Sequence, residues 1–193
     1  MADRVAISNL ALGRIGEPAR LTDPYDDTKP GRAIRAVWDI TRDTLLRQHP
    51  WNFAISRYAL PAAADVKPAF GFGYVFPLPP GFIRLVEVGD RWVFDRNDYQ
   101  LEAAGLVGQS AAAMMVRCVT RIEEVERWDP AFVDVFAWML AEEVADGLTG
   151  DRSRKLDARA AAAEAISAAK RIDAIENPPE VPVEDDWIMA RYS

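Results

Sequence analysis

Enzyme chemistry would need a nucleophile, a base or a pair of acids, and this sequence of 193 residues is poor in the first two. His49 is its sole histidine and Cys118 its sole cysteine. The Gly-x-Ser-x-Gly elbow of many serine hydrolases does not occur. We interpret His49, just before Pro50, as a cation at a helix end, with a catalytic base as the alternative. Cys118 lies in a strand-like run, which favours a packed thiol over a reactive one.

The acidic residues leave one kind of catalysis open. Glycan hydrolysis needs only two carboxylates at a suitable separation, and the chain has 30 Asp and Glu residues. Glu143 stands out because it falls on an otherwise apolar helix face, where we expect it to be buried and paired with an arginine of a neighbouring helix or subunit. One histidine and one cysteine cannot form a Cys/His zinc site, and no Gly-Lys dipeptide supports a phosphate-binding loop. We therefore expect no catalysis, no metal and no cofactor.

The C-terminal segment, residues 177–193, suggests recognition of a protein partner instead. Its prolines stop the preceding helix, and its acidic residues have too few apolar neighbours to fold against. Yet the segment ends in an apolar cluster, which is typical of a docking site at an otherwise solvated terminus. We predict an extended tail that docks on a partner through Trp187, Ile188, Met189, Arg191 and Tyr192.

The composition describes a globular chain that needs no disulfide. Apolar residues make up 50% of it, and its length suffices to bury a sizeable core. No run approaches the roughly 18 apolar residues of a membrane span, and the charged start, MADRVAISNL, lacks the apolar core of a signal peptide. We expect no membrane contact and synthesis in the cytoplasm. The net charge of -7 disfavours sequence-specific binding to DNA.

The elements that would position these residues begin with two helices in residues 1–51. A short helix is predicted from Ala2 to Gly16. A second helix has Thr28 as its cap and ends at His49, because Pro50 disfavours helical geometry in the residue before it. The spacing predicts one buried face, with Ile34, Val37, Trp38, Thr41 and Leu45. It predicts an opposite exposed face with Arg32, Arg35, Asp39, Arg42 and Asp43, in which Arg35 pairs with Asp39 and Asp43 with Arg47.

The pattern changes to strands and turns in residues 52–124. A hairpin is predicted from residues 82–88 and 91–94, a third strand from Met114 to Thr120, and a long ordered excursion from Pro61 to Gly81. Helices return in residues 125–176. Asp129 and Pro130 start a helix that is apolar nearly all round, so it should form the centre of a bundle, and Arg152 to Glu176 forms a last, alanine-rich helix. The predicted fold class is α+β, mainly α: a helical bundle with an inserted antiparallel β region and an extended C-terminal tail.

Several stretches, in order along the chain, resemble one family, the head-to-tail adaptors of short-tailed phages, also called tail tubular protein A. The fairly specific stretch is TLLRQHPWNFA at residues 44–54. The others are weaker alone: NLALGRIGE (9–17), YVFPLPPGFIRL (74–85), DPAF (129–132), LAEEVA (140–145) and WIMAR (187–191).

This resemblance implies a structural protein of the virion tail, assembled in the host cytoplasm. Such adaptors resemble a helical bundle with an inserted β region. They form a twelve-fold ring of identical subunits beneath the portal protein, bind a tail nozzle protein below, and let DNA pass through without reading its sequence. Two other classes remain open from the residues: a glycan-degrading enzyme acting during phage entry, and an unrelated helical regulatory protein.

Overall fold

A computed structural model describes residues 3–89 and 99–176 of the chain. Within these residues the fold is α+β and mainly α, as predicted, with two short 3-10 turns, Asn52–Ala54 and Val125–Arg127. Its helices are α1 (Arg4–Arg14), α2 (Lys29–Gln48), α3 (Pro130–Thr149) and α4 (Arg152–Glu176). Its strands are β1 (Ile55–Leu60), β2 (Tyr74–Phe76), β3 (Phe82–Val88), β4 (Tyr99–Glu102), β5 (Gly105–Gly108) and β6 (Met114–Thr120).

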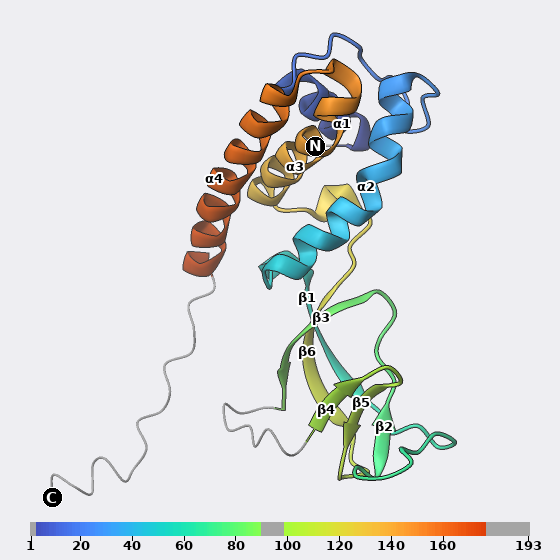
Figure 1. Cartoon of the computed structure of the whole chain (residues 1–193). Helices are drawn as coiled ribbons and strands as arrows, with labels where there is room; N and C mark the ends of the chain where they lie inside the picture. Colours follow the sequence, from blue (N-terminus) through green and yellow to red (C-terminus); the bar gives the residue numbers. More distant parts are fainter. Residues whose placement is uncertain (1–2, 90–98, 177–193) are drawn as a thin grey trace, which may run out of the picture.

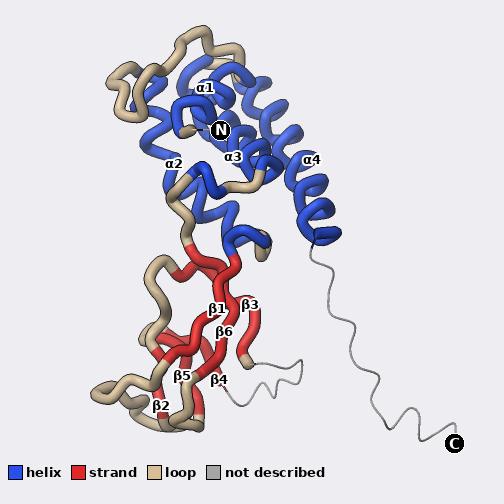
Figure 2. The backbone as a smooth tube through the Cα atoms, turned by 180° about the vertical axis from the view of Figure 1, so that it is seen from behind, coloured by secondary structure: helices blue, strands red, loops and turns tan. Residues whose placement is uncertain are grey.

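The helices gather at one end of the molecule and the strands at the other (Figure 1). All the described strands are inserted between α2 and α3, so the chain passes from the helices to the strands once and returns once. Figure 2 shows both passages, entering at β1 and leaving at β6, as neighbouring segments in the narrow part of the molecule. None of the described helices is long and apolar enough to cross a membrane.

The starts of α1, α2 and α3 each follow from a side-chain cap that the sequence contains. Asp3 accepts a hydrogen bond from the Ala6 N–H, and Thr28 accepts one from the Gly31 N–H, which satisfies amides that have no partner within the helix. Asp129 accepts from the backbone N–H groups of Ala131 and Phe132 at 2.7 and 3.3 Å. At the other end of α3, Gly150 has a φ of +66°, a left-handed conformation that glycine adopts without steric cost.

Helix α3 is the centre of the bundle, as its all-round apolar pattern predicts. It packs against α1, α2 and α4, whereas α4 makes its extensive helix contacts with α3 alone. Alanines line the buried side of α4, which lets the two backbones approach closely. They are Ala158, Ala162 and Ala169.

An aromatic cluster fills the bundle between α2, α3 and the segment that leads into α3. Phe136 packs edge-on against Trp38 of α2, with ring centroids 4.9 Å apart, and against Trp128, at 5.0 Å. These edge-to-face contacts are the geometry that aromatic quadrupoles favour. Trp38 is therefore a core residue, as its place on the predicted buried face implied, and Phe136 is a core residue too. Trp138 is only half-buried, and the guanidinium of Arg14 lies over its ring, 4.1 Å from the centroid.

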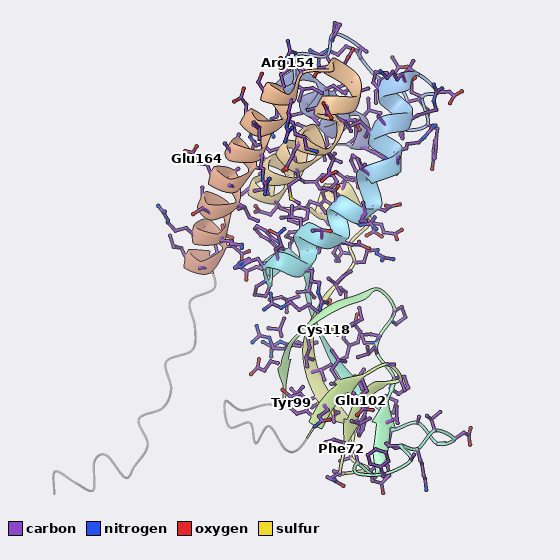
Figure 3. The ribbon with its side chains drawn as sticks, viewed as in Figure 1. Phe72, Tyr99, Glu102, Cys118, Arg154 and Glu164 are labelled. Carbon is purple, nitrogen blue, oxygen red and sulfur yellow. The ribbon has the colours of Figure 1, made fainter. Side chains whose placement is uncertain are left out.

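The strands form two antiparallel three-stranded sheets with a second, smaller apolar core. The order is β1-β6-β3 in one sheet and β2-β5-β4 in the other. Leu60, Val88 and Val116 of the first sheet meet Phe76 and Leu106 of the second. Cys118 lies buried in the sheet region, on β6 (Figure 3). Its register partners are Ser56 of β1 and Leu85 of β3.

The pairing of β3 and the content of residues 61–81 differ from the sequence predictions. Strand β3 occupies residues 82–88 as predicted, but its described partner is β6, and the expected second hairpin arm, 91–94, lies outside the described residues. The excursion from Pro61 to Gly81 is not all loop, because Tyr74–Phe76 forms β2 and pairs with β5. Neither pairing has a local signal, since the partner strands lie far along the chain.

The core and the cap of α3 should contribute unequally to stability. We expect Asp129→Ala to lower the free energy of unfolding by about 1 kcal/mol through the lost cap. Phe136→Ala should lower it by about 3 to 5 kcal/mol, because it opens a cavity among buried rings. Urea unfolding followed by circular dichroism measures both, and similar small losses at the two sites would show that the ring cluster is not the core.

Candidate functional site

The two passages between helices and strands form the candidate site, which we call the junction: residues 49–54 on the way in and 120–128 on the way out. Each passage carries a buried tryptophan whose indole N–H donates to a backbone carbonyl six residues earlier. Trp51 donates to the Leu45 carbonyl at 3.0 Å, and Trp128 donates to the Ile122 carbonyl at 2.9 Å. Both indoles are thus buried with their N–H hydrogen-bonded, so neither leaves a buried donor without an acceptor.

Phe132, in the first turn of α3, holds the two passages together. Its ring contacts Trp51 and Trp128 edge-on, with centroid distances of 5.3 and 5.2 Å. Phe53, from the first passage, adds a third contact at 4.9 Å. Three side chains, two from the first passage and one from the second, therefore converge on one ring, which fixes where the strands leave and rejoin the helices.

A polar clasp joins the last helix to the first passage. The Nε2 atom of His49 lies 2.9 Å from Oδ2 of Asp173, a buried residue near the end of α4. The other carboxylate oxygen of Asp173 accepts from the backbone N–H of Asn52 at 2.9 Å. The Asn52 side-chain amide in turn donates to the Asp173 carbonyl at 2.7 Å. Both carboxylate oxygens of Asp173 therefore have a hydrogen-bond partner in the first passage.

This clasp changes the interpretation of His49. It does cap the end of α2, as predicted, but its polar partner is a carboxylate from a residue 124 positions away, not a carbonyl of its own helix. A His–Asp pair resembles the base and its orienting group in a hydrolase. Here the carboxylate also binds the backbone of Asn52, and the imidazole contacts the Trp51 ring at 4.9 Å, so the pair joins two chain segments.

A charged cluster lies on the other side of the junction, between α2 and the second passage. Arg42 is buried, with 5% of its surface exposed, and it pairs with Asp39 and Asp43 at 3.0 Å each. Arg121, just after β6, pairs with Asp43 at 2.5 Å. Burial of Asp43 opposes its ionisation, but the hydrogen bonds and charges of Arg121 and Arg42 outweigh that effect and lower its pKa below the ordinary value.

The cluster corrects two expectations about α2. Arg42 is not on an exposed face, because its side chain is buried. The predicted ion pairs also differ: Asp39 pairs with Arg42, Asp43 with Arg42 and Arg121, and Arg35 with Asp27. Arg47 donates to the Ile83 carbonyl of β3. Helical spacing accounts for the pair of Asp39 with Arg42. Arg35, Asp43 and Arg47 also use partners that lie outside the helix.

The expectation for Glu143 is wrong. Its side chain is exposed, while Val144 and Ala145 beside it are buried, and the carboxylate that an arginine of α4 meets is that of Glu142, 3.8 Å from Arg159. Cys118 is a packed thiol, and burial raises its pKa, which disfavours the reactive thiolate. Among residues 3–89 and 99–176, no group of three His, Cys, Asp or Glu side chains could hold a metal ion.

The docking residues predicted in the C-terminal segment, Trp187, Ile188, Met189, Arg191 and Tyr192, lie outside the described residues. No protein-family model matches the sequence, and a search of curated proteins finds no match.

Removing the carboxylate of Asp173 should weaken the clasp. Asp173→Ala leaves the Asn52 N–H and His49 without their acceptor, so we expect the free energy of unfolding to fall by about 2 to 3 kcal/mol. Asp157→Ala is the matched control, because Asp157 is an exposed aspartate of the same helix. Equal effects in urea unfolding would contradict a role for the clasp.

The charged cluster should make stability depend on acid. The folded pKa of Asp43 is lowered, so its ionised form stabilises the fold above the unfolded value of 3.8, and this contribution is lost as pH falls through the lower folded pKa. We expect Asp43→Asn to destabilise the protein at pH 7 and to make progressively less difference below pH 3.8. If the difference in unfolding free energy between Asp43→Asn and the unchanged protein stays constant from pH 7 to below pH 3.8, the pairing is contradicted. Asp65→Asn is the control: Asp65 is exposed, so this substitution should change stability little at any pH.

Proposed function

We propose that this protein is a ring-forming head-to-tail adaptor of a short-tailed phage, without catalytic activity or cofactor. In this proposal, identical subunits bind side by side beneath the portal protein, a tail nozzle protein binds below, and DNA passes through the ring. The protein would be located in the virion tail, after assembly in the host cytoplasm. What supports it is the fold class together with the family-like stretch at residues 44–54, which forms the end of α2 and the first passage of the junction.

The observation that carries the proposal is the outer face of α4. This helix of 25 residues buries one side against α3, yet three large apolar side chains on its other sides are exposed. They are Leu156 (56%), Ile172 (49%) and Ile175 (73%). Leu156 lies near the start of the helix, whereas Ile172 and Ile175 lie one turn apart near its end. Neighbouring exposed apolar side chains mark protein contacts, and a ring subunit needs such a surface for its neighbour.

The two-ended shape also suits an adaptor. Large apolar side chains are exposed at both ends: Ile40 on α2 among the helices, and Phe70, in the loop before β2, among the strands. A connector between two different rings needs separate surfaces for each. The net charge of -7 fits a DNA conduit, because a protein wall that does not attract phosphates does not retain the genome.

The proposal predicts that the chain binds a portal ring. Mixing the purified chain with portal rings of a short-tailed phage that carries it, followed by electron microscopy, should give adaptor rings stacked under portals. The isolated chain should remain largely monomeric, because an acidic subunit repels its copies and the portal supplies the template. Glycan cleavage by the isolated chain, with no portal binding, would overturn the proposal.

Variants of α4 separate ring contact from folding. The double substitution Ile172→Glu, Ile175→Glu places charges on the proposed contact and should abolish stacked rings while leaving the melting temperature nearly unchanged. Leu101→Glu is a control, since Leu101 is similarly exposed (48%) but lies among the strands. Loss of rings with the control alone would show that the subunits contact one another elsewhere.

A further inference from the structure

The outer face of the β1-β6-β3 sheet carries a pair of arginines. Side chains alternate along a strand, so Tyr58 and Val116 face the small core while Arg57 and Arg117 face away from it. Arg57 of β1 is the register partner of Arg117 of β6. Like charges directly opposite each other on paired strands destabilise a sheet unless an anion lies near both.

Arg117 is only partly satisfied within the described residues. Its Nη1 atom donates to Oε2 of Glu87, 2.8 Å away on β3. Its Nε atom is buried and has no hydrogen-bond partner there. A buried donor without an acceptor costs more than the average hydrogen bond contributes. Arg57 is exposed, and Glu87 already pairs with Arg117, so the pair retains capacity for a further acceptor.

A pocket of about 330 Å³ opens at this pair, lined by Arg57, Arg117, Asn52, Ile55 and Glu176. Glu176 is the last residue of α4. The C-terminal segment of the same chain therefore begins at the wall of this pocket. Because the segment is attached beside the arginines, its effective concentration there is far higher than that of a separate molecule, which must reach the pocket by diffusion.

The sequence of that segment complements the pocket in charge. Four carboxylates, Glu180, Glu184, Asp185 and Asp186, fall within seven residues, and no lysine or arginine occurs between residues 177 and 190. An extended, proline-rich chain advances about 3.1 Å per residue, so Glu180 can reach about 12 Å from Glu176. The valines of the stretch can meet Met115, which is 51% exposed on the same sheet face.

We propose that the acidic stretch 180–186 binds the outer face of the β1-β6-β3 sheet of its own chain, with its carboxylates paired to Arg57 and Arg117. The stretch supplies a further acceptor to a pair in which the described acceptor, Glu87, bonds to Arg117. It also ties the end of α4 to the strands on the side of the His49–Asp173 clasp. The binding leaves residues 187–193 beyond it for another partner, and it does not depend on the proposed adaptor function.

A photo-cross-linking experiment on the full chain tests this binding. Val183 is replaced by benzoylphenylalanine, the protein is irradiated in low salt, and the linked peptides are identified by mass spectrometry. We expect links to peptides that contain residues 57–59 or 115–117. Arg57→Glu should lower the ratio of linked to unlinked chain about fivefold, the size of an exposed ion pair. Salt at about 1 M should lower it similarly, because the Debye length falls to about 3 Å.

Three controls keep the result unambiguous. Arg152→Glu makes the same charge change at an exposed site at the opposite end of α4 and should leave the links unchanged. Combining Arg57→Glu with Glu184→Lys and Asp185→Lys should restore part of the yield. Mixing isotope-labelled with unlabelled chain shows whether the segment and the sheet that it links to belong to the same chain or to two different chains. Links between labelled and unlabelled chains, links to other surfaces, or an unchanged yield in Arg57→Glu would each overturn the proposal.

Discussion

The ring of Phe132 receives a side chain from each passage between the helices and the strands, and the shape of the molecule depends on these contacts. A chain that leaves a bundle and returns after some seventy residues must fix two crossing points, or the inserted sheets would rotate about them. Trp51 and Trp128 fix one each by burying an indole on the same ring and satisfying its N–H on a nearby carbonyl. The loop-closure entropy of the insertion is thus offset inside the bundle core and, beside it, by the pairing of β1 with β6.

The polar contacts of the junction lie around this apolar centre and depend on it. The Asp173 clasp holds α4 to the first passage, and the Arg42–Asp43–Arg121 cluster holds α2 to the second. Neither set would be strong in open water, because exposed ion pairs contribute little. Both gain from partial burial beside the aromatic rings, where Arg42 and Asp173 are almost covered. Aromatic packing therefore contributes most of the stability of the junction. The charged pairs add to it and fix which segments lie side by side.

Local signals in the sequence predict the helices well and the junction poorly, for a physical reason. Asp129, Pro130 and Gly150 act on their own neighbours, so the bounds of α3 follow from them. The partner of His49 lies 124 residues away, and nothing near either residue indicates it. The burial of Arg42 and the pairing of β3 with β6 likewise arise from contacts between distant segments. The sequence marks the first passage only through the helix stop at His49-Pro50 and through the family-like stretch at residues 44–54, and neither indicates the contacts that the passage makes.

The distribution of charge connects the junction to the rest of the surface. Most of the ion pairs described join an arginine to an aspartate or glutamate of another element or turn, and such pairs contribute no net charge. They include Arg14 with Asp134, Arg117 with Glu87, and Arg121 with Asp43. The excess of seven acids must therefore reside in groups outside these pairs, and four of the chain's acids fall within residues 180–186. A protein that pairs many of its arginines with acids has fewer unpaired cations on its surface than its arginine content suggests. For the proposed conduit this has a direct benefit: the same pairs that hold the strands to the helices also remove the cations that would retain DNA.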